Sequence, residues 1–126
     1  MRRFSLACLL LCVLAACSGH EGALSLACEG QRRLLRGNLE EPWQGVRQSQ
    51  QDKQVTYAFQ GHKLEGMHDC EVWNAREIRC THSKSDGSAA RNFRFDRESL
   101  SVRDQVFTRG RSLTEEVTFE GECKLR

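Results

Sequence analysis

The chain has 126 residues, a formal net charge of +2 at pH 7 and seven cysteines. This length suits one small domain, and the small positive charge is accounted for by Arg2 and Arg3 in the first segment of the chain. A sequence this close to neutral therefore gives no reason to expect a nucleic-acid partner.

The first segment places two arginines before a largely apolar stretch, Phe4 to Ala16, that ends in small residues. This order is typical of an export signal, and the stretch is shorter than the roughly 20 residues of a membrane-spanning helix. Its last residues, Leu14-Ala15-Ala16-Cys17, resemble the lipobox of bacterial lipoproteins. The resemblance implies that residues 1–16 are removed as a signal peptide and that Cys17 carries the lipid.

The same resemblance implies an address in the bacterial cell envelope. In that family an aspartate after the lipidated cysteine often retains the protein in the inner membrane, and here the residue is Ser18. We therefore expect a lipid anchor in the outer membrane, facing the periplasm. The alternative is an ordinary signal peptide that leaves a soluble exported protein.

The remaining cysteines support lipidation by their number. Two leave with the signal peptide, and if Cys17 carries lipid an even set remains: Cys28, Cys70, Cys80 and Cys123. An even number in an exported chain predicts a disulfide framework.

After a lipidated tether, residues 17–23, we expect one β domain over residues 24–126. Leu24, Leu26 and Cys28 alternate with smaller residues and give a weak strand signal. Residues 31–53 are mostly polar and are interpreted as a solvated loop, with a basic patch on anionic lipid headgroups as the alternative.

From residue 54 onward the apolar residues recur with a period of two, which predicts strands. The Gly61-His62 pair suits a two-residue hairpin turn that sets Phe59 opposite Leu64. A loop at residues 74–76 predicts one register with three matching rungs: Val72 opposite Ile78, Glu71 opposite Arg79, and Cys70 opposite Cys80.

The later strands follow the same alternation. We predict Phe95 opposite Leu100 and Phe93 opposite Val102. Folding the last strand back adds three further pairs: Val102 with Val117, Leu100 with Phe119, and Arg103 with Glu116.

The sequence therefore predicts an all-β fold, an antiparallel meander of about seven strands. Pairing of the first strand with the last would close a small barrel and remove its exposed edges. With Cys70–Cys80 assigned by register, Cys28–Cys123 follows by elimination and from this closure. Cys28–Cys70 with Cys80–Cys123 remains an alternative.

The predicted registers bring three charged residues to one end of the sheet, with Asp104 between Arg91 and Glu115. They form a candidate binding rim for a partner's charged group, or simply a solvated edge. His68 and His82 fall opposite each other, but zinc needs three or four ligands and exported cysteines are usually oxidised, so we expect no metal and no cofactor. Motifs typical of hydrolases or phosphate binding are missing.

In its anchor, size and β content the chain resembles small envelope lipoproteins that block another protein, such as lysozyme inhibitors and immunity proteins. We therefore expect a non-enzymatic protein-binding module. The alternative function is a structural or assembly lipoprotein of the outer membrane, and a hydrolase is third.

Overall fold

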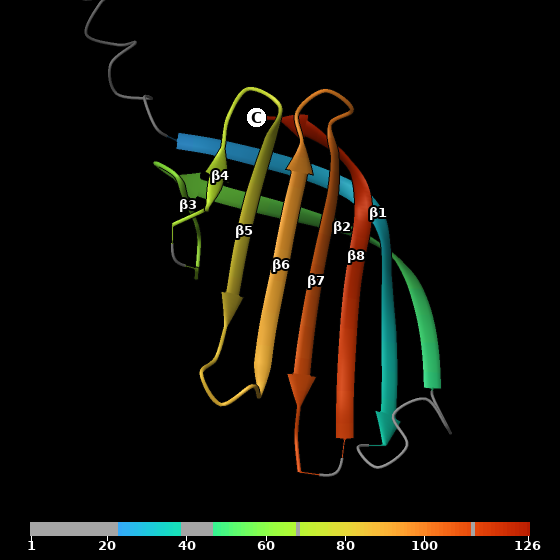
Figure 1. Ribbon diagram of the computed structural model, residues 1–126. Helices are drawn as coiled ribbons and strands as arrows, with labels where there is room; N and C mark the ends of the chain where they lie inside the picture. Colours follow the sequence, from blue (N-terminus) through green and yellow to red (C-terminus); the bar gives the residue numbers. More distant parts are fainter. Residues whose placement is uncertain (1–22, 39–46, 68, 112) are drawn as a thin grey trace, which may run out of the picture.

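The computed structural model describes residues 23–38, 47–67, 69–111 and 113–126. Its strands form one antiparallel sheet of eight strands in the order β3-β2-β1-β8-β7-β6-β5-β4 (Figure 1). Within these ranges no helix occurs, so the predicted all-β meander is confirmed. The strands are β1 (Ala23–Asn38), β2 (Arg47–Gln60), β3 (Lys63–Leu64), β4 (Val72–Trp73), β5 (Glu77–Ser83), β6 (Ala89–Asp96), β7 (Ser101–Arg109) and β8 (Leu113–Leu125).

The sheet is a half-barrel, and the predicted closed barrel is wrong. The first and last strands do pair, with Cys28 directly opposite Cys123. However, β1 uses its other edge to pair with β2, so the two ends of the sheet are β3 and β4. The gap in the half-barrel therefore lies between β3 and β4, and not between the first and last strands of the chain.

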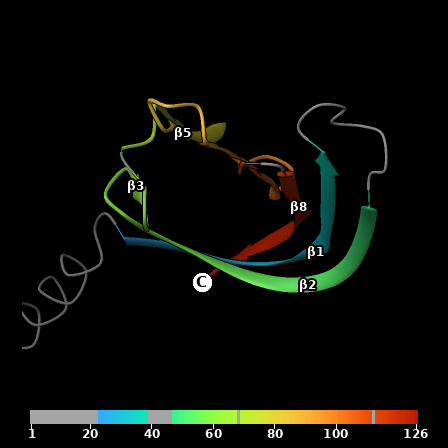
Figure 2. The ribbon, with the colours of Figure 1, turned by 90° about the horizontal axis from the view of Figure 1, so that it is seen from below.

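Two glycines allow β1 and β8 to bend together. Gly30 and Gly121 lie opposite each other, and a Cβ added to Gly30 would lie 1.9 Å from the carbonyl oxygen of Glu120. Only glycine permits this approach, and glycine inside a strand often marks a bend. Figure 1 shows β1, β2 and β8 curving so that one end of β1 and β2 crosses behind the strands that follow, and Figure 2 shows this end as a second layer.

This bend divides the molecule into two halves. The closed half, where two layers face each other, contains residues 23–30, 53–60, 77–80, 93–96, 101–104 and 119–125. The open half is a single layer and contains residues 31–38, 47–52, 81–83, 89–92, 105–109 and 113–118. Among the described residues, the buried apolar side chains lie in the closed half or in the segment 64–67 beside it.

Aromatic rings fill the centre of the closed half. Phe93 is completely buried and meets Tyr57 and Phe59 edge-on, with ring centroids 4.8 and 5.6 Å apart. Such pairs stabilise by about 1 kcal/mol beyond the burial of their area. The core residues are Leu26, Cys28, Tyr57, Phe59, Leu64, Met67, Ile78, Cys80, Phe93, Phe95, Val102, Phe119 and Cys123.

In the closed half, side chains bridge the gap between the two ends of the sheet. Trp73 of β4 packs edge-on against Phe59 of β2 at 5.3 Å and stacks on His62 at 4.8 Å. The Arg97 guanidinium lies 5.3 Å from the centroid of the same indole, at cation–π distance. A backbone hydrogen bond from Cys70 N to His62 O, 2.8 Å, adds a link there.

Both predicted disulfides are confirmed. Cys28–Cys123 joins directly opposite residues of β1 and β8, and Cys70–Cys80 joins β5 to the segment before β4. Four cysteines permit three pairings, and the structure excludes the alternative of Cys28 with Cys70.

The register that suggested Cys70–Cys80 is wrong by one residue, although the bond is right. Val72 lies opposite Arg79 rather than Ile78, because Asn74 caps a tighter turn by accepting hydrogen bonds from the backbone of Arg76 and Glu77 at 2.8 and 2.9 Å.

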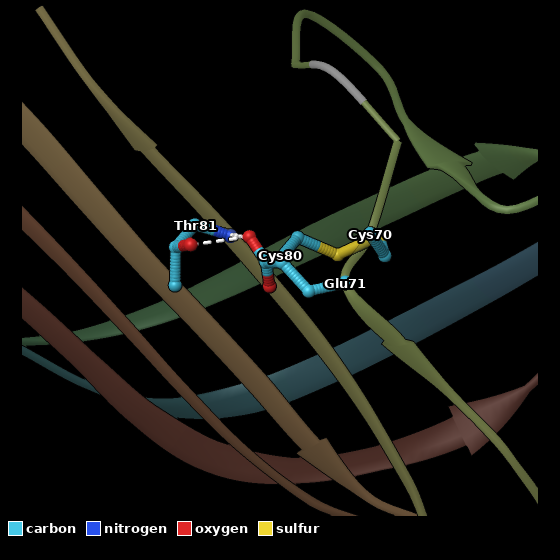
Figure 3. Close-up of a disulfide and its surroundings, with 4 residues drawn as sticks. All are labelled: Cys70, Glu71, Cys80 and Thr81. Atoms are coloured by element: carbon cyan, nitrogen blue, oxygen red, sulfur yellow. Dashed lines mark hydrogen bonds between the residues drawn. A yellow bond between two sulfur atoms is a disulfide. The ribbon is translucent and has the colours of Figure 1, made fainter.

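The chain then leaves the ladder before Val72, so Glu71 does not pair with Arg79 as predicted. Instead, the Glu71 carboxylate accepts a hydrogen bond from the backbone N of Thr81, 2.7 Å, and another from its hydroxyl (Figure 3). Beside the Cys70–Cys80 disulfide, a side chain thus accepts the hydrogen bond that a backbone carbonyl of a paired strand would accept.

Two other predicted registers are also wrong. Phe95 lies opposite Val102, because residues 97–100 form a longer turn in which Leu100 has a φ of 56°. In β8, Val102 faces Gly121 and Arg103 faces Glu120, so Val117 and Glu116 are further along. The predicted pair of Phe59 with Leu64 is confirmed.

The predicted loop over residues 31–53 is replaced by strand on both sides of residues 39–46, which lie outside the described residues. β1 continues to Asn38 and β2 begins at Arg47. Both strands pair there along their length, and β1 also pairs with β8. Pairing with distant residues, rather than local propensity, accounts for these strands.

Candidate functional site

A partly buried ion pair lies on the inner face where the two halves meet. Arg91 of β6 donates to both carboxylate oxygens of Asp104 of β7, at 3.0 and 2.9 Å. Tyr57 of β2 reaches across the interior and donates its hydroxyl to the same carboxylate at 2.9 Å. Asp104 is only 9% exposed, and these hydrogen bonds satisfy a carboxylate that burial would otherwise penalise.

Within this network, Tyr57 and Arg91 keep their protons. Burial raises the pKa of Tyr57 far above its usual range, and the negative charge of Asp104 adds to the effect. Burial opposes the charge of Arg91, but its hydrogen bonds to Asp104 and the attraction of that carboxylate outweigh burial and raise the pKa of Arg91. Tyr57 therefore remains a donor and Arg91 remains a cation, as suits a positioning network rather than an acid–base pair.

Two members of the predicted rim meet, and the third does not. Arg91 and Asp104 are paired, but diagonally, because Arg91 lies opposite Val106 and Asp104 lies opposite Phe93. The predicted neighbour Glu115 is displaced by the shifted β7–β8 register, which sets Phe119 opposite Asp104. The two carboxylates are thus not cross-strand neighbours.

Glu115 has a different partner. Arg36 of β1 lies opposite Glu115 and pairs with it at 3.0 Å near the far end of the open half. Arg36 was not foreseen because it falls in the segment predicted to be a loop.

Between these two ion pairs runs an apolar row that sequence reasoning missed. Leu34 of β1 lies opposite Val117 of β8, and Val117 lies opposite Val106 of β7. All three side chains are half-buried, on the same face as Arg91 and Asp104. For Leu34 the only sequence signal is an isolated Leu34-Leu35 pair in a polar segment, which does not reveal which leucine points inward.

We call the inner face of the open half, together with the bordering residues Lys53 and Asp104, the concave face. Its middle is the apolar row Leu34, Val117 and Val106, and basic residues border it on both sides. In the described strands its charged members are Arg32, Arg36, Lys53, Arg91, Asp104 and Glu115, with His82 opposite Arg91 at one border. No other layer of the described residues covers this face, so it is an apolar strip within a basic frame.

Two predicted positions lie outside the described residues: Cys17, the lipidation site, and His68, the expected neighbour of His82. Among the residues that the structure describes, no group of three or more potential ligands could hold a metal ion. Over the same ranges, no helix is sufficiently long and apolar to cross a bilayer.

Comparisons with protein-family models, with curated proteins and with solved structures give no match for this chain. What the fold defines is an all-β half-barrel with two disulfides, and its concave face is not covered by another layer of the described residues.

Proposed function

We propose that this chain is an exported lipoprotein whose β domain acts as a non-enzymatic protein-binding module, of the inhibitor or immunity type. The observation that carries the proposal is the concave face, where the row Leu34, Val117 and Val106 remains half-exposed on a single-layer sheet. A sheet normally buries one face against another layer. A partner segment that supplied this layer would remove the apolar row from water.

The chemistry of the concave face selects an acidic partner. Its basic residues outnumber its acidic ones, since Asp104 and Glu115 are already paired with Arg91 and Arg36. Arg32 and Lys53 are the additional cations. Charge complementarity steers association and excludes wrong partners. The matching surface is therefore a protein segment with an apolar ridge flanked by carboxylates.

A pair of neighbouring substitutions on β8 tests the binding face. Val117→Glu places a carboxylate in the apolar row, whereas Thr118→Glu places the same charge on the outer face, opposite Arg33. Both positions are half-buried. We expect capture of an envelope or secreted protein by the full chain to weaken at least about tenfold with Val117→Glu and to stay unchanged with Thr118→Glu.

Circular dichroism must show that both variants keep the wild-type sheet. Equal capture by wild type and Val117→Glu would remove the concave face from the proposal. Capture of one soluble secreted protein supports the inhibitor or immunity type. Capture of a resident membrane complex supports the alternative, a structural or assembly lipoprotein.

The anchor has its own test. The sequence Leu14-Ala15-Ala16-Cys17 supports lipidation of Cys17, which would hold the domain on the membrane. Cells fed labelled palmitate should incorporate label into the wild type and not into Cys17→Ala, which should leave the membrane fraction or accumulate as precursor. An unlabelled wild type would refute the lipoprotein assignment.

A further inference from the structure

β2 has a long free edge in the part of the chain that the structure describes. One edge of β2 pairs with β1, while the other pairs only with β3, at Phe59 and Gln60. Residues 48–54 are all exposed. A free edge presents unpaired backbone N–H and C=O groups and can template another strand.

The backbone groups on this edge can be assigned. Glu65 N donates to Ala58 O at 3.0 Å, so the backbone of Ala58 points away from β1. Because backbone groups alternate in direction along an antiparallel strand, every second residue shares this orientation. The outward residues of the free edge are Gln48, Gln50, Asp52, Gln54 and Thr56, and none of them is proline.

Side chains on the outer face already hold β2 in an extended form. Gln54 donates to Glu29 at 3.1 Å, Gln50 donates to Gln31, and Gln31 donates to Asp52 at 3.5 Å. These bonds fix the free edge against β1. A strand that is ordered beforehand loses less conformational entropy when it binds.

We propose that the free edge of β2 pairs with β2 of a second copy of this chain. The two strands would run antiparallel about a two-fold axis perpendicular to the sheet, with Gln51 opposite its own copy. Gln50 then lies opposite Asp52 of the second copy, and Gln48 lies opposite Gln54. The same patch serves both copies, as in other two-fold interfaces.

The charge pattern along β2 selects this register. A two-fold centred on Asp52 or on Lys53 would place like charges directly opposite each other, which destabilises a strand pair. In the Gln51 register each Asp52 instead meets the amide of Gln50.

The length of the free edge excludes the other registers. Centring on Gln50 shortens the ladder, because β2 begins at Arg47. Centring on Gln54 requires the backbone of Ala58, which is already bonded to Glu65. The Gln51 register thus combines the longest free ladder with no like charges opposite each other. This pairing uses the edge of the sheet and leaves the concave face open, so it is independent of the proposed function.

Cysteine cross-linking of the full chain in whole cells tests the register. Residue 51 would form a non-hydrogen-bonded pair with its copy, at a Cα separation of about 4.5 Å, which a disulfide can span. Gln51→Cys should therefore give a dimer on a non-reducing gel. Gln54→Cys, on the same exposed strand, should not, because it would face Gln48. Equal cross-linking of both variants, or of neither, overturns the proposal.

Sedimentation of the detergent-extracted full chain tests the backbone pairing itself. Gln50→Pro removes an outward N–H at a position where an edge strand tolerates proline. Gln50→Ala changes the same side chain and keeps the N–H. We expect dimers for wild type and Gln50→Ala, and loss of the dimer for Gln50→Pro with unchanged thermal unfolding of the sheet. A monomeric wild type, or a dimeric Gln50→Pro, overturns the proposal.

Discussion

The closed half and the open half use the same strands and the same period of two, but only one of them has a core. In the closed half, strands bent at Gly30 and Gly121 face the rest of the sheet and bury residues such as Phe93 and Ile78 completely. In the open half, Leu34, Val106 and Val117 occupy equivalent inward positions and stay half-exposed. The difference lies in what covers the inner face, and not in the alternation of side chains.

The closed half therefore accounts for most of the stability, whereas the open half carries the proposed binding surface. Burial of apolar area contributes about 25 cal/mol per Å², so the closed half supplies most of the hydrophobic stabilisation. The open half relies on strand hydrogen bonds and on exposed pairs such as Arg36–Glu115, which contribute about 0–1 kcal/mol. Regions of low local stability are where binding surfaces are commonly found. A partner on the concave face would supply the missing layer.

Among these predictions, removing the disulfides should have the largest effect on stability. Cys28 and Cys123 are 95 residues apart, whereas Cys70 and Cys80 are 10 apart. On the loop-closure model, cross-linking the longer loop stabilises by about 4.7 kcal/mol, against at most about 3 kcal/mol for the shorter one. Replacing both Cys28 and Cys123 by alanine should therefore lower the free energy of unfolding more than replacing both Cys70 and Cys80, as measured by urea denaturation.

Hydrogen exchange measures which half of the sheet loses stability when a disulfide is removed. Cys28–Cys123 lies in the closed half close to the glycine bend, so without it the backbone amides of the closed half should exchange nearly as fast as those of the open half. The variant lacking Cys70–Cys80 serves as the control, in which the closed half stays better protected. If the two double variants lose equal stability, loop closure does not govern these bonds.

In β6 and β7, period-two alternation was sufficient to predict which residues point inward. Phe93, Phe95 and Val102 are all buried as expected, although the pairing of β6 with β7 is shifted by two residues. A shift by an even number keeps every side chain on its face, so the error in register did not disturb the core. The turn that caused it depends on the left-handed conformation of Leu100, for which its residue type gives no signal.

The part of the concave face formed by β1 and β2 could not be predicted, because these segments lack the alternation that identifies strands. Residues 48–54 are exposed on both faces of the sheet, so they show no alternation of apolar and polar residues. In the open half β1 is held between β2 and β8, a contact that is distant in sequence. Arg91 and Asp104 were correctly brought together, but Leu34 and Arg36 depend on this pairing and were therefore missed.

A smaller effect is expected when the carboxylate of each ion pair is replaced by an amide. Asp104→Asn should destabilise the protein by about 3 kcal/mol, because it leaves the charge of Arg91 without its carboxylate in a site where that side chain is 28% exposed. Glu115→Gln should cost less than about 1 kcal/mol, because its partner Arg36 is 51% exposed and can be solvated. Both values follow from urea denaturation at neutral pH.

Salt provides the control for this last comparison. Raising the ionic strength to about 1 M shortens the screening length to about 3 Å, so the contribution of an exposed pair should vanish while that of a buried pair largely remains. The cost of Glu115→Gln should therefore fall to zero in high salt, and that of Asp104→Asn should persist. Equal costs in low salt would mean that solvent reaches Asp104 as freely as Glu115, and that the inner face is as open at Asp104 as it is at Glu115.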